Sequence, residues 1–441
     1  MRWHPASQLL TVWGVSISLF VMLPFHIVNR EITVYGFVML GLFIAAFCTG
    51  AWFKTPVIQQ RHAAFFQMPD FKRADNLLML VSIFSMIVLF IEFRSGSAGD
   101  LTAAYEIRSQ RSTSLLNGDA SGSSLAFQLG FLTSPVGYTV LVREIIYREK
   151  IKPLRMIILG FGPLILSSLA LGGRGPLLLA FTLASFALLT KRTAFAEKVA
   201  KVKLRTRSRS SNFFLITISV IGVIVALNYF VTVFFLRAGE GGAAGMFDAI
   251  GDAWGVTFDG PVAEAMKATL GLGITYLIFV FSWYIVQGIV IANVLFTSYT
   301  GPAQLGIYGI ELAGAVARRI DSNFVAVRNY SLFDLNVFGF VPSAFGTLYV
   351  DYWYFGILVA AGWGYLTSVV YLRSRTSSDA RWLIAAPFMM QGVLYSGVNT
   401  PLGQTNGLVT FSWMIVTFMM AKPRKGKSLN PGSLQPRRKV A

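Results

Sequence analysis

The sequence feature that most constrains the fold is a series of apolar runs that recurs from the N-terminus to residue 421. Each run approaches the roughly 20 apolar residues that a helix needs to cross a bilayer. Only 13% of the residues are charged, whereas about 25% is usual in soluble domains. The short alternating segments of a transmembrane β-barrel do not occur. We therefore predict an all-α polytopic integral membrane protein with about 10–12 transmembrane helices.

The apolar runs set the bounds of the predicted spans. These are about 9–28, 33–53, 76–93, 124–142, 156–170, 177–190, 212–236, 273–296, 345–371, 382–398 and 407–421. We expect one transmembrane domain over 1–421 and a disordered basic tail over 422–441. The first run lacks a small-residue cleavage site after it, which predicts an uncleaved span rather than a signal peptide.

The basic loops indicate the orientation of the spans. The loops after spans two, four and six, the segment 373–381 and the C-terminal tail are rich in Lys and Arg, which predicts that they and both termini are cytoplasmic. The outer loops are then about 94–123, 237–272 and 318–344. A single crossing by 273–296 would break this alternation. Either that segment is re-entrant, giving ten crossings, or 302–317 crosses back and gives twelve, which is the solution we expect.

The basic residues assigned to the outer side are nearly all arginine. Of the 38 Lys and Arg residues in the chain, those outside are Arg30, Arg94, Arg108, Arg111, Arg174, Arg237, Lys267, Arg318, Arg319 and Arg328. Orientation needs only positive charge, whereas bidentate binding of phosphate or carboxylate favours the planar guanidinium. The bias predicts an outer anion-binding site, with chance and structural ion pairs as the alternative. The net charge of +18 follows orientation and does not indicate a nucleic-acid partner.

The stretch 171–176, LGGRGP, places Arg174 between two apolar runs. Its glycines permit a sharp turn and close approach to a ligand, and Pro176 suits the first turn of a new helix. The N-terminus of a helix presents free N–H groups and a positive dipole end. Together these features predict that Arg174 contributes to a phosphate site.

Asp351 is an acidic residue near the start of an apolar span, within the aromatic stretch around Tyr349. A carboxylate at such a place is costly and is a functional candidate by default. Asp351 is predicted either to act as a base of raised pKa or to form an ion pair with Arg174 or Arg237 that fixes the helices. An outer loop with Asp334 and Asn336 comes just before it.

These motifs resemble those of the oligosaccharide repeat-unit polymerases, also called O-antigen polymerases, of bacterial envelopes. The resemblance rests on the Arg174–Pro176 step, on Glu106 and Arg108 after the third span, and on the outer loop around Asn336. It extends to the span that contains 346–351 and 355–356. The chain departs from the family pattern at 352–354, where Tyr-Trp-Tyr stands.

The resemblance implies a glycosyltransferase in the bacterial cytoplasmic membrane. Its substrates are polyprenyl-pyrophosphate-linked oligosaccharides, which it joins on the outer face into an O-antigen, capsule or exopolysaccharide, alongside a flippase and a chain-length regulator. Arg174 and Asp351 are its predicted catalytic residues. The predicted substrate-binding residues are Arg108, Arg111, Arg237, Arg318, Arg319, Arg328, Asp334, Asn336 and Tyr349.

No metal or organic cofactor is predicted. Histidine occurs only at His4, His26 and His62, the single cysteine is Cys48, and no phosphate-binding loop of a nucleotidase is found. The acidic residues Asp248 and Asp252 fit a solvated helix face better than a cation site. An O-antigen ligase is disfavoured because no histidine lies in an outer loop. A transporter or flippase for an anionic lipid-linked glycan stays the main alternative.

Overall fold

Helices dominate the computed structural model, which describes residues 4–28, 30–53, 69–97, 124–148, 152–171, 175–194, 255–321, 341–377, 379–404 and 406–422, with single positions between them. Eight helical segments of these residues are long and apolar enough to cross a membrane. The chain is therefore a multi-pass membrane protein. The predicted span 212–236, most of the predicted outer loop 94–123, part of the predicted outer loop 237–272, and the tail after residue 422 lie outside the described residues.

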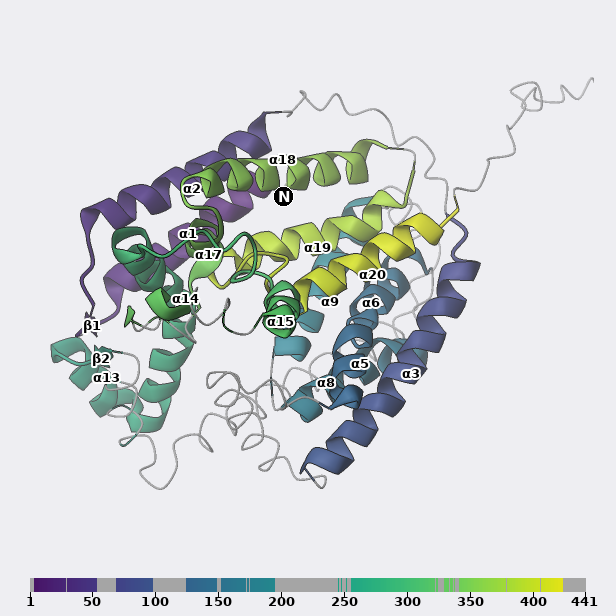
Figure 1. The fold of residues 1–441 in the computed structure, drawn as a ribbon, viewed down its shortest axis with the longest axis horizontal. Coiled ribbons are helices and arrows are strands. Elements are labelled where there is room, and N and C mark those ends of the chain that lie inside the picture. The colour runs from purple at the N-terminus through teal and green to yellow at the C-terminus, as the bar shows by residue number, and fades with distance from the viewer. Residues whose placement is uncertain are drawn as a thin grey trace, which may run out of the picture.

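The N-terminal half of the described chain is almost entirely helical (Figure 1). Its elements are α1 (Pro5–Met22), β1 (Phe25–Ile27), α2 (Val34–Trp52), α3 (Lys72–Ser97), α5 (Leu125–Thr133), α6 (Val136–Tyr147), α7 (Pro153–Arg155), the π-helix η2 (Met156–Phe161), α8 (Gly162–Leu171) and α9 (Gly175–Ala194). Side-chain caps start α1, α2 and α5: His4 accepts from the Ala6 N–H, Thr33 from the Gly36 N–H, and Ser124 from the Phe127 N–H. The predicted start of a helix beside Pro176 is confirmed.

The C-terminal half contains shorter helices. Its elements are β2 (Val256–Phe258), α13 (Pro261–Leu270), α14 (Leu272–Ser298), α15 (Glu311–Ile320), α17 (Ser343–Tyr352), α18 (Phe355–Thr376), α19 (Trp382–Leu394), the 3-10 turn η4 (Tyr395–Gly397) and α20 (Gly407–Met420). The predicted span 345–371 is broken at Trp353, which has a positive φ of 52°. Only α18 is long enough to cross, and Asp351 lies on the short helix α17 that precedes it.

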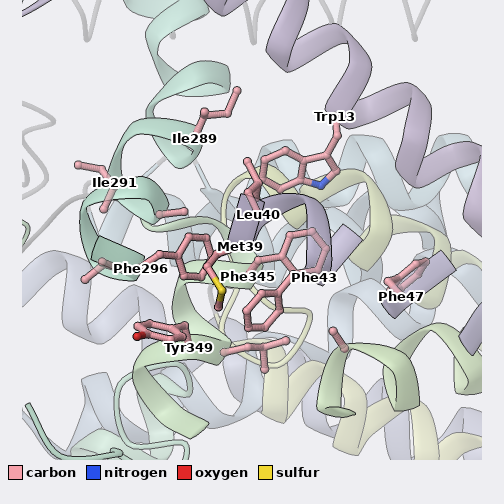
Figure 2. Close-up of a cluster of buried hydrophobic side chains, with 14 of the residues drawn as sticks. Trp13, Met39, Leu40, Phe43, Phe47, Ile289, Ile291, Phe296, Phe345 and Tyr349 are labelled. Carbon is pink, nitrogen blue, oxygen red and sulfur yellow. The ribbon is translucent and has the colours of Figure 1, made fainter. Parts of the chain in front are cut away.

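An aromatic core joins α1, α2, α14 and α17 (Figure 2). Phe43 stacks on Phe296 with ring centroids 5.4 Å apart, and Trp13 stacks on Phe345 at the same distance. Helix α18 packs closely on α2, since Gly364 leaves no room for a Cβ beside the Phe47 carbonyl. A second core is formed by α6, α8, α9, α19 and α20.

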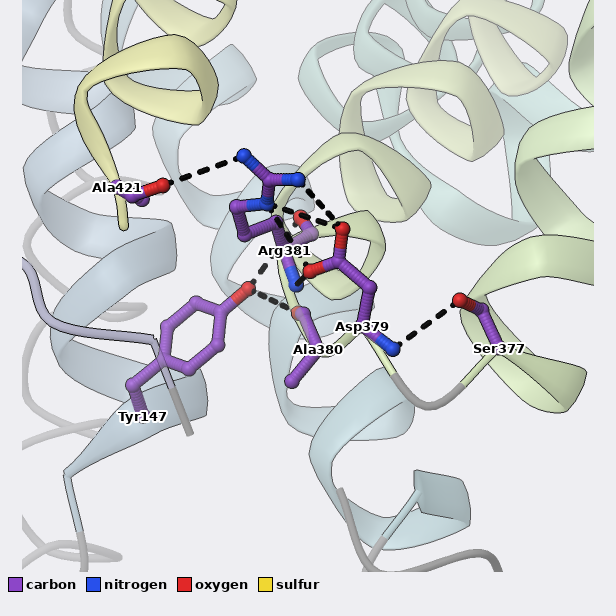
Figure 3. Close-up of polar contacts among 6 residues, drawn as sticks. All are labelled: Tyr147, Ser377, Asp379, Ala380, Arg381 and Ala421. Carbon is purple, nitrogen blue, oxygen red and sulfur yellow. Dashed lines mark hydrogen bonds and ion pairs between the residues drawn. The ribbon is translucent and has the colours of Figure 1, made fainter. Parts of the chain in front are cut away.

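Several segments that the sequence assigned to the cytoplasm meet at one end of the bundle, at the upper right in Figure 1. Asp70 pairs with Lys422 through their backbones, and the Lys191 ammonium donates to the Arg148 carbonyl at 2.6 Å. Arg381 forms an ion pair with Asp379 and donates to the Ala421 carbonyl (Figure 3). We call this region the basic end, and the opposite end, with β1, β2 and α13, the far end.

Acidic side chains neutralise part of the basic end. Arg143 forms ion pairs with Asp75 and with Glu144, whose side chain is fully buried. Glu144 is also paired with Arg148 and, at 3.2 Å, with Arg155. These ion pairs join α3, α6 and α7. Removing one partner would leave the opposite charge buried and unpaired, which is strongly destabilising.

Helix α14, which is long and apolar enough to cross, contacts the connection between α1 and α2. Its middle touches this connection at Phe25, whose ring lies 5.9 Å from that of Trp283. Near its C-terminus, Asn293 accepts from the Thr33 N–H and donates to the Thr33 carbonyl, both at 2.9 Å. Because Phe296 stacks on Phe43 in the middle of α2, the second half of α14 packs on this connection and on α2.

The predicted return crossing by 302–317 is wrong. Residues 299–310 are not helical, and α15 has only ten residues, about half of what a span requires. Turns form here because Leu305 and Gly306 both adopt positive φ values, which no helix tolerates. The structure therefore favours the solution in which residues 302–317 do not cross the membrane.

Candidate functional site

A non-helical segment lies between α19 and α20, two helices too short to span a bilayer. They have 13 and 14 residues, which gives each a length of about 20 Å against a hydrocarbon core of about 30 Å. The segment 395–406, which we call the buried loop, is therefore placed within the bundle. Its residues Ser396, Gly397, Gly403 and Asn406 are buried.

Many of the hydrogen-bonding groups of the buried loop are paired with side chains or with backbone groups. Ser396 accepts from the Trp13 indole N–H at 3.0 Å. Asn399 donates to the Gly403 carbonyl at 3.1 Å, and Asn406 donates to the Phe131 carbonyl at 3.1 Å. Non-helical backbone at membrane depth is tolerated only where protein buries it or where it lines a polar cavity. The loop meets that requirement by bonding to α1, α5 and itself.

Asp351 anchors a second non-helical segment, 304–309, against the buried loop. Its two carboxylate oxygens accept from the Tyr308 N–H at 3.2 Å and from the Gly309 N–H at 2.9 Å. The Gly309 carbonyl then packs on Gly403, where no Cβ would fit. Thr347, one turn before Asp351 on α17, donates to the Asn399 side chain at 3.2 Å. Asp351 is thus joined to the buried loop through both its helix and its bound segment.

The environment of Asp351 favours its neutral form. The residue is 2% exposed, and burial raises the pKa of its carboxyl to about 6, while the amides of Gly306, Tyr308 and Gly309 oppose the shift. The ion pair to Arg174 or Arg237 stays a prediction, because both arginines lie outside the described residues. Within the described part of the chain, backbone amides are the groups that hold this carboxylate.

The start of α9, at Gly175 and Pro176, approaches the buried loop from the other side. The buried Tyr138 hydroxyl on α6 donates to the Pro176 carbonyl at 3.1 Å. A cavity of about 10 Å³, room for about one water molecule, is lined by Tyr138, Gln391, Gln404 and Thr410 and by apolar residues that include Leu179 and Pro401. The side-chain nitrogen of Gln404 is buried and has no hydrogen-bond partner among the described residues. Helix α9 and the buried loop therefore share this small cavity.

The structure describes four of the residues predicted to bind substrate. On α15, Arg318 is half-buried and Arg319 is exposed, and Asp334 is exposed. Tyr349 is 2% exposed and packs edge-on against Phe296, with ring centroids 5.2 Å apart. The other predicted site residues, which lie outside the described residues, are Arg108, Arg111, Arg174, Arg237, Arg328 and Asn336.

Sequence reasoning missed the residues that connect the two halves of the site. Tyr138 and Gln391 lie within predicted spans, Gln404 lies between two of them, and none was predicted as a site residue. One signal was available: the octet 399–406, NTPLGQTN, is polar and follows an apolar run that contains Gln391. Comparisons of the chain with models of protein families, with curated proteins and with solved structures find no match.

We predict that Tyr138→Phe loosens the start of α9. The variant removes only the hydroxyl that holds the Pro176 carbonyl, so amide hydrogen exchange at Gly173 and Gly175 should become faster. Tyr147→Phe is the matched control, since that buried hydroxyl donates to the Ala380 carbonyl at the basic end. Each variant should lose about 0.5–1.5 kcal/mol of stability. Equal exchange at Gly173 and Gly175 in the two variants would contradict the assignment.

A second prediction concerns pH and Asp351. Because its pKa is higher in the folded protein than in the unfolded chain, folding favours the protonated carboxyl. The stability of the wild type relative to Asp351→Asn should therefore rise as pH falls from about 7 to about 4, by up to about 3 kcal/mol. Asp334→Asn, at an exposed position, should show no such trend. Unfolding in detergent at several pH values measures the difference in stability between the wild type and Asp351→Asn. A stability advantage of the wild type that shrinks as the pH falls would refute this prediction.

Proposed function

We propose that the protein is a membrane glycosyltransferase that joins polyprenyl-pyrophosphate-linked oligosaccharide repeat units into a surface polysaccharide. The donor is a growing glycan on its lipid pyrophosphate, and the acceptor is one lipid-linked repeat unit. The reaction takes place on the outer face of the bacterial cytoplasmic membrane, with both termini in the cytoplasm. A flippase that delivers the repeat unit and a chain-length regulator are the expected partners.

One observation carries the proposal. The start of α9 at Pro176, which follows Arg174 in the sequence, and Asp351 both connect to the buried loop. Pro176 does so through Tyr138, which lines one cavity with Gln404, and Asp351 does so through Gly309 and Gly403. Both lie away from the basic end, where the segments assigned to the cytoplasm by the sequence meet. A polar region inside an apolar bundle suits a substrate with a sugar head and a lipid tail.

The proposed chemistry is a displacement at an anomeric carbon. The acceptor hydroxyl oxygen forms the new glycosidic bond, the bond between the anomeric carbon and the pyrophosphate oxygen breaks, and the acceptor proton passes to a base. Negative charge builds on the departing lipid pyrophosphate, and arginines stabilise it without the help of a metal. Arg174 is the proposed cation. Asp351, with a pKa near neutrality, or the exposed Asp334 is the proposed base.

A transporter or flippase for an anionic lipid-linked glycan is the second candidate. It is favoured by the broken helices: α5 and α6 are separated at Pro135, α17 and α18 at Trp353, and α19 and α20 by the buried loop. Transporters build substrate sites from such discontinuous helices near the midplane of the membrane. The arginine bias at the predicted outer side favours the polymerase, because a transport pathway needs cations along its depth.

Reconstitution into vesicles with a defined lipid-linked repeat unit tests the proposal. We expect a ladder of glycan lengths that forms without ATP and without added metal. Transfer of the intact lipid-linked unit across the bilayer, with no new glycosidic bond, would refute the polymerase and support the flippase.

The same assay tests the role of Arg174. Arg174→Lys keeps the charge but loses the planar guanidinium, which can donate two hydrogen bonds to one phosphate. We therefore expect the rate of polymerisation to fall by a factor of about ten or more. Arg192→Lys on the exposed last turn of α9 is the matched control and should keep full activity. Full activity in Arg174→Lys would reduce Arg174 to a residue of packing or orientation.

A further inference from the structure

Helix α15 has two chemically distinct faces. One stripe, formed by Leu312, Val316 and Ile320 together with Ala313 and Ala317, is entirely apolar. The opposite stripe contains Glu311, Gly314, Ala315 and Arg318, and Arg319 lies at the boundary between them. Such a separation of apolar and charged residues is typical of a helix at a boundary between an apolar and a polar medium.

The protein packs against α15 at Gly314 of the polar stripe and leaves Val316 and Ile320 of the apolar stripe exposed, while Leu312, Ala313 and Ala317 are half-buried. Gly314 is buried, and a Cβ there would lie 2.8 Å from the Ile307 carbonyl oxygen. On the other side, Ile320 is 81% exposed and Val316 is 49% exposed. A helix on the surface of a water-soluble protein has the reverse arrangement, with its apolar stripe on the core.

The start of α15 lies at the level where two helices enter the membrane. The preceding segment is held by Asp351, which is four residues before the start of the spanning helix α18. At that start, the hydroxyl of the exposed Tyr354 lies 2.9 Å from that of Tyr35 at the first turn of α2. Exposed tyrosines at the ends of spanning helices are typical of the interface between membrane and water. Residues 304–309 therefore bring Glu311 to the membrane surface at the far end.

We propose that α15 is an interfacial helix that inserts its Val316–Ile320 stripe into the lipid acyl chains at the far end, with Arg318 and Arg319 bound to phospholipid phosphates. The bilayer suits this face because it offers an apolar layer directly beneath anionic groups. Ten residues make a helix of about 15 Å, short enough to lie on the surface beside α18. This inference does not depend on the proposed glycosyltransferase activity.

A fluorescent probe on α15 tests the proposal. The only cysteine in the chain, Cys48, is buried, so a Cys48→Ala background permits labelling at one introduced cysteine. We compare Ile320→Cys on the apolar stripe with Ala315→Cys on the opposite stripe, in the full-length protein in nanodiscs that contain brominated phosphatidylglycerol. Leu358→Cys, at an exposed position on the first turn of α18, reports a residue within a spanning helix.

The probe at Ile320 should lose most of its fluorescence to the brominated lipid, as the probe at Leu358 does, while the probe at Ala315 keeps most of its fluorescence. Quenching at Ile320 that is no stronger than at Ala315 would overturn the insertion. This conclusion holds both for a probe that iodide in solution also quenches, which faces water, and for a probe that another part of the protein shields. Folding of each labelled variant is checked by its elution as a single species.

The role of the two arginines is tested in the Ile320→Cys background. Quenching should fall when zwitterionic lipid replaces phosphatidylglycerol, and this dependence should disappear in the double variant Arg318→Gln with Arg319→Gln. The variant Arg192→Gln, at the basic end, is the control and should keep the dependence of quenching on lipid charge. Quenching that is independent of lipid charge in the unmodified helix would overturn the phosphate contacts.

Discussion

The requirement that non-helical backbone inside a membrane protein be satisfied by the protein itself governs the centre of this structure. The buried loop meets it with hydrogen bonds to Trp13 of α1 and to the Phe131 carbonyl of α5. A second segment, held by the Asp351 carboxylate, covers the loop at Gly403. Helices from both halves of the chain are joined by these bonds, so the loop fixes the distance between the two cores.

Charge is separated along the bundle. At the basic end, Glu144, Asp75 and Asp379 are paired with arginines, so the cations there have structural partners. On the far side, Asp351 is satisfied by backbone amides, and Arg319 is exposed on α15. This contrast agrees with two uses of positive charge in one chain: orientation and rigidity at one end, and anion binding at the other.

Much of the fold could be predicted from the sequence, because apolar runs and basic loops report spans and their alternation directly. The start of α9 at Pro176 and the apolar surroundings of Asp351 could also be predicted, because proline favours the first turn of a helix and Asp351 lies in an apolar run. Hydropathy could not reveal that much of the polar octet 399–406 is buried, because the same residues suit an exposed turn. Nor could it show that α14 contacts the α1–α2 connection, because that contact depends on the hydrogen bonds between Asn293 and Thr33.

The central claim is that the Arg174–Pro176 step, Asp351 and the buried loop form one site for a lipid-linked glycan. Photo-crosslinking with a repeat unit that carries a diazirine on its sugar and a polyprenyl pyrophosphate tests it most directly. The account predicts that mass spectrometry finds crosslinks within 171–176, 304–309 and 395–406, and that excess unlabelled substrate removes them. Crosslinks confined to the basic end, around 143–155 and 379–381, would contradict it.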